Sequence, residues 1–156
     1  MALSEITNNQ VAPSGMPSKS VLQVVNVKSS AAQSTTSSTF QDTALTASIT
    51  PSSTSSKILI LANVSMYSSS GNTQGSATVF RGDASGTNLG TALYGFGGAF
   101  SAGSAKGVVV FNYLDSPATT SSQTYTVGIA STDNSGSIQI NINTETSTLT
   151  LMEISA

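Results

Sequence analysis

The chain contains no cysteine and no histidine, and charged residues make up only 8% of its 156 positions. Without cysteine there is neither a disulfide nor thiolate chemistry. Without histidine, Ser-His-Asp catalysis and histidine-ligated zinc are excluded. An ordinary globular domain has roughly 25% charged residues. The net charge of −2 gives no positive field for gathering phosphates, so we expect no nucleic-acid partner.

Serine and threonine take the place of the missing charges, with 30 and 21 residues, about a third of the chain. Hydrophobic residues make up 38%, enough for the core of one domain of this length. No apolar run approaches the ~20 residues that span a bilayer as a helix, and the first residues lack the basic and apolar regions of a signal peptide. We therefore expect no membrane partner and no export by a standard signal. Low charge also removes a main barrier to association with other proteins.

The longest apolar run, residues 57–67, follows a seven-residue polar turn at residues 50–56. With a period of two, one face collects Ile58, Ile60, Ala62, Val64 and Met66. Leu59 and Leu61 begin the opposite face, which is also apolar at its start. This pattern predicts a central strand that is partly covered on both sides.

Further strands are predicted from β-branched and alternating segments. They cover residues 21–28, 40–49, 76–81, 107–114, 124–130, 137–143 and 147–153. No segment carries an apolar stripe of period 3.6, so we expect negligible helix. Eight or nine strands separated by Ser, Gly and Asn turns predict an all-β fold, a two-sheet antiparallel β-sandwich with jelly-roll connections. An up-and-down barrel remains open as an alternative topology.

Residues 1–20 differ from the β-sandwich domain predicted over residues 21–156, because they are rich in proline and poor in apolar side chains. Proline at this spacing forbids a helix and favours extended backbone. One interpretation is a frayed terminus. The other is an extended arm that pairs with the exposed edge of a neighbouring protein. The candidate contact residues of this arm are Leu3, Ile6, Val11, Pro13 and Pro17.

Residues 88–100 interleave Tyr94, Phe96 and Phe100 with four glycines. Dense glycine marks bends or close backbone approach. Aromatic rings in such a segment fill a core or a subunit interface, and we favour that prediction over a carbohydrate-binding platform.

The remaining motifs give weak signals for chemistry. Arg81-Gly82-Asp83 is the tripeptide that integrins recognise, but Gly-Asp is common turn chemistry and we favour a turn. A glycosidase needs two carboxylates in one cleft, and no pair stands out among the seven acids: Glu5, Asp42, Asp83, Asp115, Asp133, Glu145 and Glu153. We therefore predict that the protein is not an enzyme and has no cofactor or metal. A calcium site at Asp133 and Asn134 stays an open alternative without EF-hand spacing.

Three segments carry a resemblance to a known family. They are Ser20-Val21-Leu22-Gln23-Val24-Val25, the run from Ser48 to Ile60 with its Thr50-Pro51-Ser52-Ser53 turn, and Thr148-Leu149-Thr150-Leu151-Met152-Glu153-Ile154. They resemble small virion proteins and tail-fibre domains of tailed phages of cyanobacteria and other aquatic bacteria. The opening Met1-Ala2-Leu3-Ser4 is also similar to that family's starts.

The resemblance implies a jelly-roll or tumour-necrosis-factor-like sandwich that forms a homotrimer on the outer surface of a virion. A domain of this size with a short arm resembles a capsid decoration (cement) protein that binds the major capsid protein. The chain has no repeat or heptad segment of the kind expected in a fibre shaft. The alternative is a tail-fibre or receptor-binding tip that recognises host surface glycan. These motifs are structural, and none identifies a capsid-binding patch.

Overall fold

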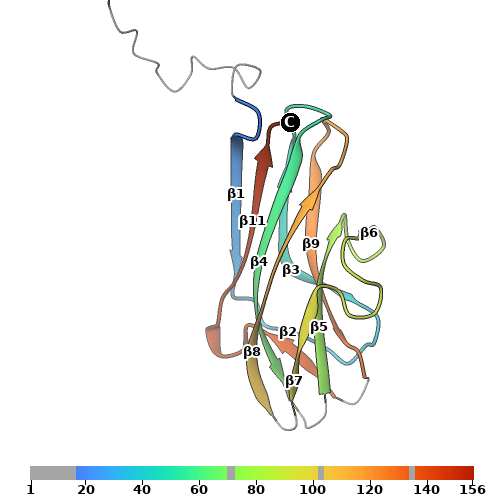
Figure 1. Cartoon of the computed structure of the whole chain (residues 1–156). Coiled ribbons are helices and arrows are strands. Elements are labelled where there is room, and N and C mark those ends of the chain that lie inside the picture. The colour runs from blue at the N-terminus through green and yellow to red at the C-terminus, as the bar shows by residue number, and fades with distance from the viewer. Residues whose placement is uncertain (1–16, 70–72, 102–103, 134–135) are drawn as a thin grey trace, which may run out of the picture.

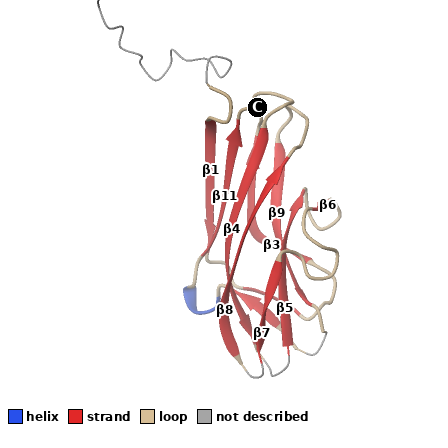
Figure 2. Ribbon diagram, viewed as in Figure 1, coloured by secondary structure: helices blue, strands red, loops and turns tan. Residues whose placement is uncertain are grey.

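Strand β4 (Lys57–Ser68) lies at the centre of one of two antiparallel sheets in the computed structural model (Figures 1 and 2). The structure describes residues 17–69, 73–101, 104–133 and 136–156. Strand β4 pairs with β11 and β10 along one edge and with β8 along the other. The predicted central strand is therefore confirmed. On its outer face, however, Leu61 remains 37% exposed, so the cover expected on that side is incomplete.

The first sheet contains six strands, which pair in the order β1-β11-β4-β10-β2 with β8 on the free edge of β4. Their bounds are β1 (Val21–Ser29), β2 (Gln33–Thr35), β4 (Lys57–Ser68), β8 (Ala105–Asp115), β10 (Ile138–Ile140) and β11 (Ser147–Ile154). β11 and β10 pair with the same edge of β4, β11 along residues 57–63 and β10 along residues 66–68. Over most of its length the sheet is therefore four strands wide.

The second sheet contains five strands, which pair in the order β3-β9-β5-β6 with β7 also on β5. Their bounds are β3 (Gln41–Ile49), β5 (Thr73–Arg81), β6 (Thr87–Asn88), β7 (Gly97–Ser101) and β9 (Gln123–Ser131).

The strand pairs nest in the order of a jelly roll. β1 pairs with β11, β3 with β9, β4 with β8 and β5 with β7, so the two ends of the chain pair first and its middle pairs last. When strand pairs nested in this way are distributed over two sheets that pack face to face, they form a jelly-roll sandwich. The predicted all-β jelly-roll sandwich is confirmed, and two separate sheets exclude the barrel alternative.

The core lies between the two sheets and is formed by alternate residues, as the period of two requires. The predicted inner face of β4, from Ile58 to Met66, is at most 3% exposed. Leu45, Ala47 and Ile49 of β3 face it, and Tyr125, Val127 and Ile129 of β9 complete the layer. This packing joins the two sheets through one continuous core.

Several short segments differ from the prediction. β6 and β7 lie between the predicted strands 76–81 and 107–114, where no strand is predicted. β2 lies between the predicted strands 21–28 and 40–49, where no strand is predicted because the sequence Gln-Ser-Thr carries no apolar alternation. The strand predicted over residues 137–143 ends at Ile140, where Asn141 adopts a φ of 55°. Asparagine tolerates this left-handed conformation, and a 3₁₀ turn (η2, Ile142–Thr144) follows. The described residues contain no helix that is long and apolar enough to cross a bilayer.

The glycines of residues 88–100 mark close backbone approach, as predicted. A Cβ atom at Gly98 would lie 1.8 Å from the carbonyl oxygen of Gly75. Gly95 has a φ of +57°, and a Cβ atom there would lie 2.2 Å from the carbonyl oxygen of Ala77. Both glycines therefore let this segment lie directly against β5.

Candidate assembly surfaces

The outer face of β1, β11, β4 and β8, here called the open face, carries rows of side chains in register across four strands. In one row Val24 lies beside Met152, Met152 beside Leu59 and Leu59 beside Leu114. All four side chains are apolar, so this row is a continuous apolar band. The next row is mixed, with Asn26, Thr150, Leu61 and Asn112 in register.

The apolar residues of the open face are strongly exposed. Val110 is 70% exposed, Val108 59% and Val24 55%, and Leu114 reaches 47%. Two shallow hollows interrupt the surface, one of about 280 Å³ beside Leu61 and Val110 and one of about 440 Å³ beside Leu59 and Leu114. Contiguous exposed apolar patches that are rimmed by polar residues mark interaction sites. The open face has this character.

The charges around the open face are almost all positive. Lys28 and Lys57 are exposed on it, and Lys19 lines the larger hollow. Within the described residues, none of these three lysines forms an ion pair. Lys106 differs, since its ammonium group lies 2.7 Å from Glu145 Oε1.

The outer face of β9 and β5, here called the covered face, is packed beneath the chain's own loops, whereas the outward side chains of β3 from Ala44 to Ser48 remain exposed. Its strands β5 and β9 are buried almost throughout on both sides. The ring of Phe80 lies over Gly128, where an added Cβ atom would be 2.6 Å from the ring. Phe40 meets Phe80 edge to face at a centroid distance of 6.1 Å, and with Ala130 they form a small second core.

The loop of residues 82–96 forms part of this cover and is hydrogen-bonded to the edge of β5. The amide of Leu89 donates to the carbonyl of Val79 at 3.0 Å, and the amide of Phe96 donates to the carbonyl of Ala77 at 2.9 Å. Thr78 Oγ1 donates to Asn88 Oδ1, which also accepts from the amide of Gly90 at 3.0 Å. The loop therefore satisfies groups of β5 that would otherwise face solvent.

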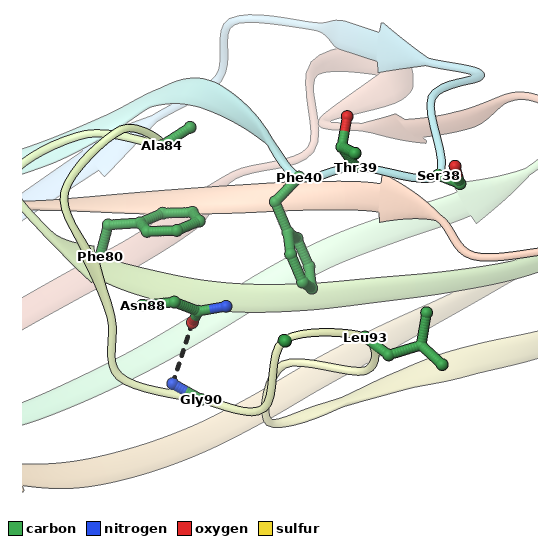
Figure 3. A pocket seen from close by; sticks show the side chains of 9 residues that line it. Ser38, Thr39, Phe40, Phe80, Ala84, Asn88, Gly90 and Leu93 are labelled. Atoms are coloured by element: carbon green, nitrogen blue, oxygen red, sulfur yellow. Dashed lines mark hydrogen bonds between the residues drawn. The ribbon is translucent and has the colours of Figure 1, made fainter.

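A hollow of about 590 Å³ lies on the covered face between this loop and residues 38–40 (Figure 3). The Phe40 and Phe80 side chains, Asn88 and Leu93 surround it. Phe40 is only 8% exposed and Phe80 only 4%, so little ring surface is available for stacking on a sugar. The Asn88 side chain is already bonded to Thr78, Gly90 and Thr91.

The three aromatic residues predicted for a core or an interface have different surroundings. Phe96 is partly buried against the main core and stacks on Phe111 of β8, with centroids 4.8 Å apart and planes within 9°. Tyr94 is 48% exposed at the tip of the 82–96 loop, next to Leu93 at 50%. Phe100 lies on β7, where its backbone pairs with Gln74.

Of the predicted arm, Leu3, Ile6, Val11 and Pro13 lie outside the described residues, and only Pro17 is placed. Pro17 is exposed, and its carbonyl accepts hydrogen bonds from the Ser20 amide and the Ser155 hydroxyl. The amide of Lys19 donates to the carbonyl of Ser155 at 3.1 Å. Residues 17–20 therefore lie beside the C-terminal end of β11, and Lys19 borders the open face.

One buried cluster that the sequence did not bring together joins β5, β8 and β9. Arg81 Nε lies 2.9 Å from Asp115 Oδ2, and the Tyr125 hydroxyl donates to the same oxygen at 2.7 Å. Burial raises the pKa of Tyr125, and the hydrogen bond to Asp115 raises it further. A tyrosine held in this way stays protonated and links the sheets rather than acting as a base.

A second buried carboxylate, Glu153 on the inner side of β11, is fully enclosed. Its Oε2 accepts from Gln23 Nε2 at 2.6 Å, and its Oε1 accepts from the Ser52 amide and hydroxyl at 2.7 Å each. Burial alone would raise the pKa of Glu153, but these hydrogen bonds outweigh it and leave the pKa below its ordinary value. The charged carboxylate thus ties β1 and the 50–56 turn to β11.

The other weak motifs are also placed. The guanidinium of Arg81 is bonded to Asp115, and Asp83 accepts from the Ser85 amide at 2.9 Å, so Arg81-Gly82-Asp83 forms a turn with its arginine turned inward. Asp133 Oδ2 accepts from the amide of Gln74, while Asn134 lies outside the described residues. No group of three or more acidic side chains converges among the described residues.

Comparison with known proteins finds a structural likeness but no related sequence. No protein-family model and no curated protein matches the chain. Among solved structures, it is similar to VP2 of infectious bursal disease virus in a D431N mutant particle, with a TM-score of 0.48 and 13% identity. A VP2 subviral particle gives a TM-score of 0.43 and 14% identity. These matches cover 100% of this chain and 41% and 43% of the VP2 chains, so the chain spans less than half of their length. The likeness is slight.

Proposed function

We propose that this chain is a virion structural protein, a homotrimeric capsid decoration protein that binds the major capsid protein on the outer surface of the shell. The observation that carries the proposal is the open face, a rigid sheet surface with exposed Val24, Leu114, Val108 and Val110. An apolar surface with few charges and no paired carboxylates suits contact with protein better than catalysis. The resemblance of the strand and turn segments to small phage virion proteins supplies the virion context.

The arm of residues 1–20 is the proposed link to the capsid. Its residues Leu3, Ile6 and Val11 would lie along a strand edge of the major capsid protein, where main-chain hydrogen bonds supply affinity. Three arms on one trimer act together, and such linkage raises overall affinity by roughly 10²–10⁴ over a single arm. A clamp that binds assembled but not separated capsid subunits stabilises the shell by mass action.

The copy number of the protein per purified particle tests the placement. A shell protein is present in hundreds of copies, whereas a tail component is present in a few to a few tens. Deletion of residues 1–18 tests the role of the arm in capsid binding. We expect this deletion variant to form a folded trimer that no longer binds capsids. Normal capsid occupancy by that deletion variant would remove the arm from the mechanism.

The second candidate is a receptor-binding tip that recognises host glycan, for which the 590 Å³ hollow beside Phe40 and Phe80 is the candidate site. Its rings are largely buried, which weakens this candidate. A glycan-array assay separates the two functions, since a decoration protein has no glycan ligand and a receptor-binding tip has one.

A further inference from the structure

No segment among the described residues covers the open face, and its charges decide which partner fits it. Lys28 and Lys57 project from it without an acidic partner among the described residues. Packing two open faces against each other would therefore bring like charges together, which disfavours a symmetric pair. A surface that is apolar and carries carboxylates would complement the open face.

The 82–96 loop on the covered side has this character. Leu93 and Tyr94 project from it, 50% and 48% exposed. Asp83 is exposed on the same loop, and Asp42 is exposed beside it, accepting a hydrogen bond from the Ala84 amide at 2.8 Å. The backbone bonds to β5 described above hold the loop rigid, so little ordering is needed when it docks.

We propose that the 82–96 loop of one copy docks onto the open face of a second copy, with Leu93 and Tyr94 on the apolar rows and Asp42 and Asp83 towards the lysines. The contact joins two different surfaces, so it is heterologous. Repetition of such a contact closes into a ring when the rotation allows it. The inference deepens the proposed assembly role and rests on it only for the number of subunits.

The test mixes two full-length variants, each with one damaged surface. Val110→Asp damages the open face, and Leu93→Asp damages the loop. Both side chains are at least half exposed, so both variants are expected to fold with the wild-type melting temperature. Ser122→Asp, at an exposed position of the loop between β8 and β9 that belongs to neither surface, is the control. Sedimentation velocity reports the assembly state.

We expect each damaged variant alone to be a monomer, because an unpaired charge in the contact weakens association by at least about 100-fold. The equimolar mixture should form a dimer and nothing larger, since only one intact loop and one intact open face can meet. Ser122→Asp should assemble as the wild type does.

Three results would overturn the proposal: a monomeric wild-type protein, a mixture that stays monomeric, or a Leu93→Asp variant that assembles normally. A monomeric wild-type protein would also remove the homotrimer from the proposed function, whereas the other two results leave that function untouched. The copy number per particle tests the decoration role separately, because it is measured on virions and does not depend on which surfaces meet. A trimer that survives both substitutions would keep the decoration role and remove only this pairing of surfaces.

Discussion

The two outer faces of the sandwich are built on the same alternation but end in different states. On the covered face, Phe80 and Ala130 are buried by the chain's own loops, at 4% and 0% exposure. On the open face, Val110 is 70% exposed although it lies in an equally apolar strand. The difference comes from connections, because the long 82–96 loop folds back on β5, whereas no described loop crosses β4 or β8. A sheet face left bare in this way is available to another protein.

The largest expected effect is on the covered face. Phe80→Ala should lower the free energy of unfolding by about 3–5 kcal/mol, because it leaves a cavity between Gly128 and Phe40. Leu93→Ala, at the exposed rim of the same region, should change it by less than about 0.5 kcal/mol. Urea denaturation measures both. Equal losses would mean that the covered face is not a core.

The next effect concerns the inner side of the open sheet. Glu153→Gln should lower the free energy of unfolding at pH 7 by about 2–3 kcal/mol, because an amide nitrogen would face the donors from Ser52 or Gln23. The outward substitution Met152→Gln, one residue away, is the matched control. It should cost much less, because Met152 is only partly buried.

The same carboxylate predicts a pH dependence. The folded pKa of Glu153 is lowered, so its contribution is complete above the unfolded value of about 4.3 and is lost as pH falls through the folded pKa. The stability gap between wild type and Glu153→Gln should therefore narrow as pH falls below about 4. A constant gap from pH 7 to pH 3 would contradict the assigned charge.

Val109 and Val110 give a smaller but cleaner comparison, because they are neighbours on β8 that point to opposite sides. Val109→Thr buries a hydroxyl in a site that is 8% exposed and should cost about 1–3 kcal/mol in chemical denaturation. Val110→Thr should be within about 0.5 kcal/mol of wild type. Similar costs at both positions would mean that the open face is covered in the monomer.

The smallest expected effect is electrostatic. Lys57→Glu should weaken self-association several-fold at low salt and less at high salt, since exposed charges are screened over about 10 Å at 0.1 M. Ser122→Glu should leave the association constant unchanged. A Lys57→Glu variant that associates more tightly would show that the partner surface is not acidic.

The sequence predicts the sandwich because its apolar alternation is strong in residues 57–67 and 107–114. It does not reveal β2, whose three residues are all polar. Nor does it reveal the Glu153 site, because Gln23 and Ser52 lie 130 and 101 residues away along the chain. Alternation marks Val108 and Val110 as one face of β8, but only the path of the 82–96 loop decides that this face stays open.

The candidate surfaces were predicted less well than the fold. The sequence predicts one role for Tyr94 and Phe96, a core or an interface, yet Phe96 packs on Phe111 while Tyr94 is exposed. The interface role of Tyr94 stays a prediction, as does the arm of residues 1–20. The sequence does not indicate that the lysines of the open face share one surface, because their neighbours on the sheet come from strands that are distant in sequence.

The most direct test of the account uses the absence of cysteine. A single thiol introduced as Val110→Cys reports on the open face, and one introduced as Ser122→Cys reports on an exposed loop. If the open face is a subunit contact, Val110→Cys should react with a bulky maleimide about 10-fold more slowly in concentrated than in dilute protein, following the free fraction. Ser122→Cys should react equally fast in both. Equal rates for Val110→Cys at all concentrations would contradict the account.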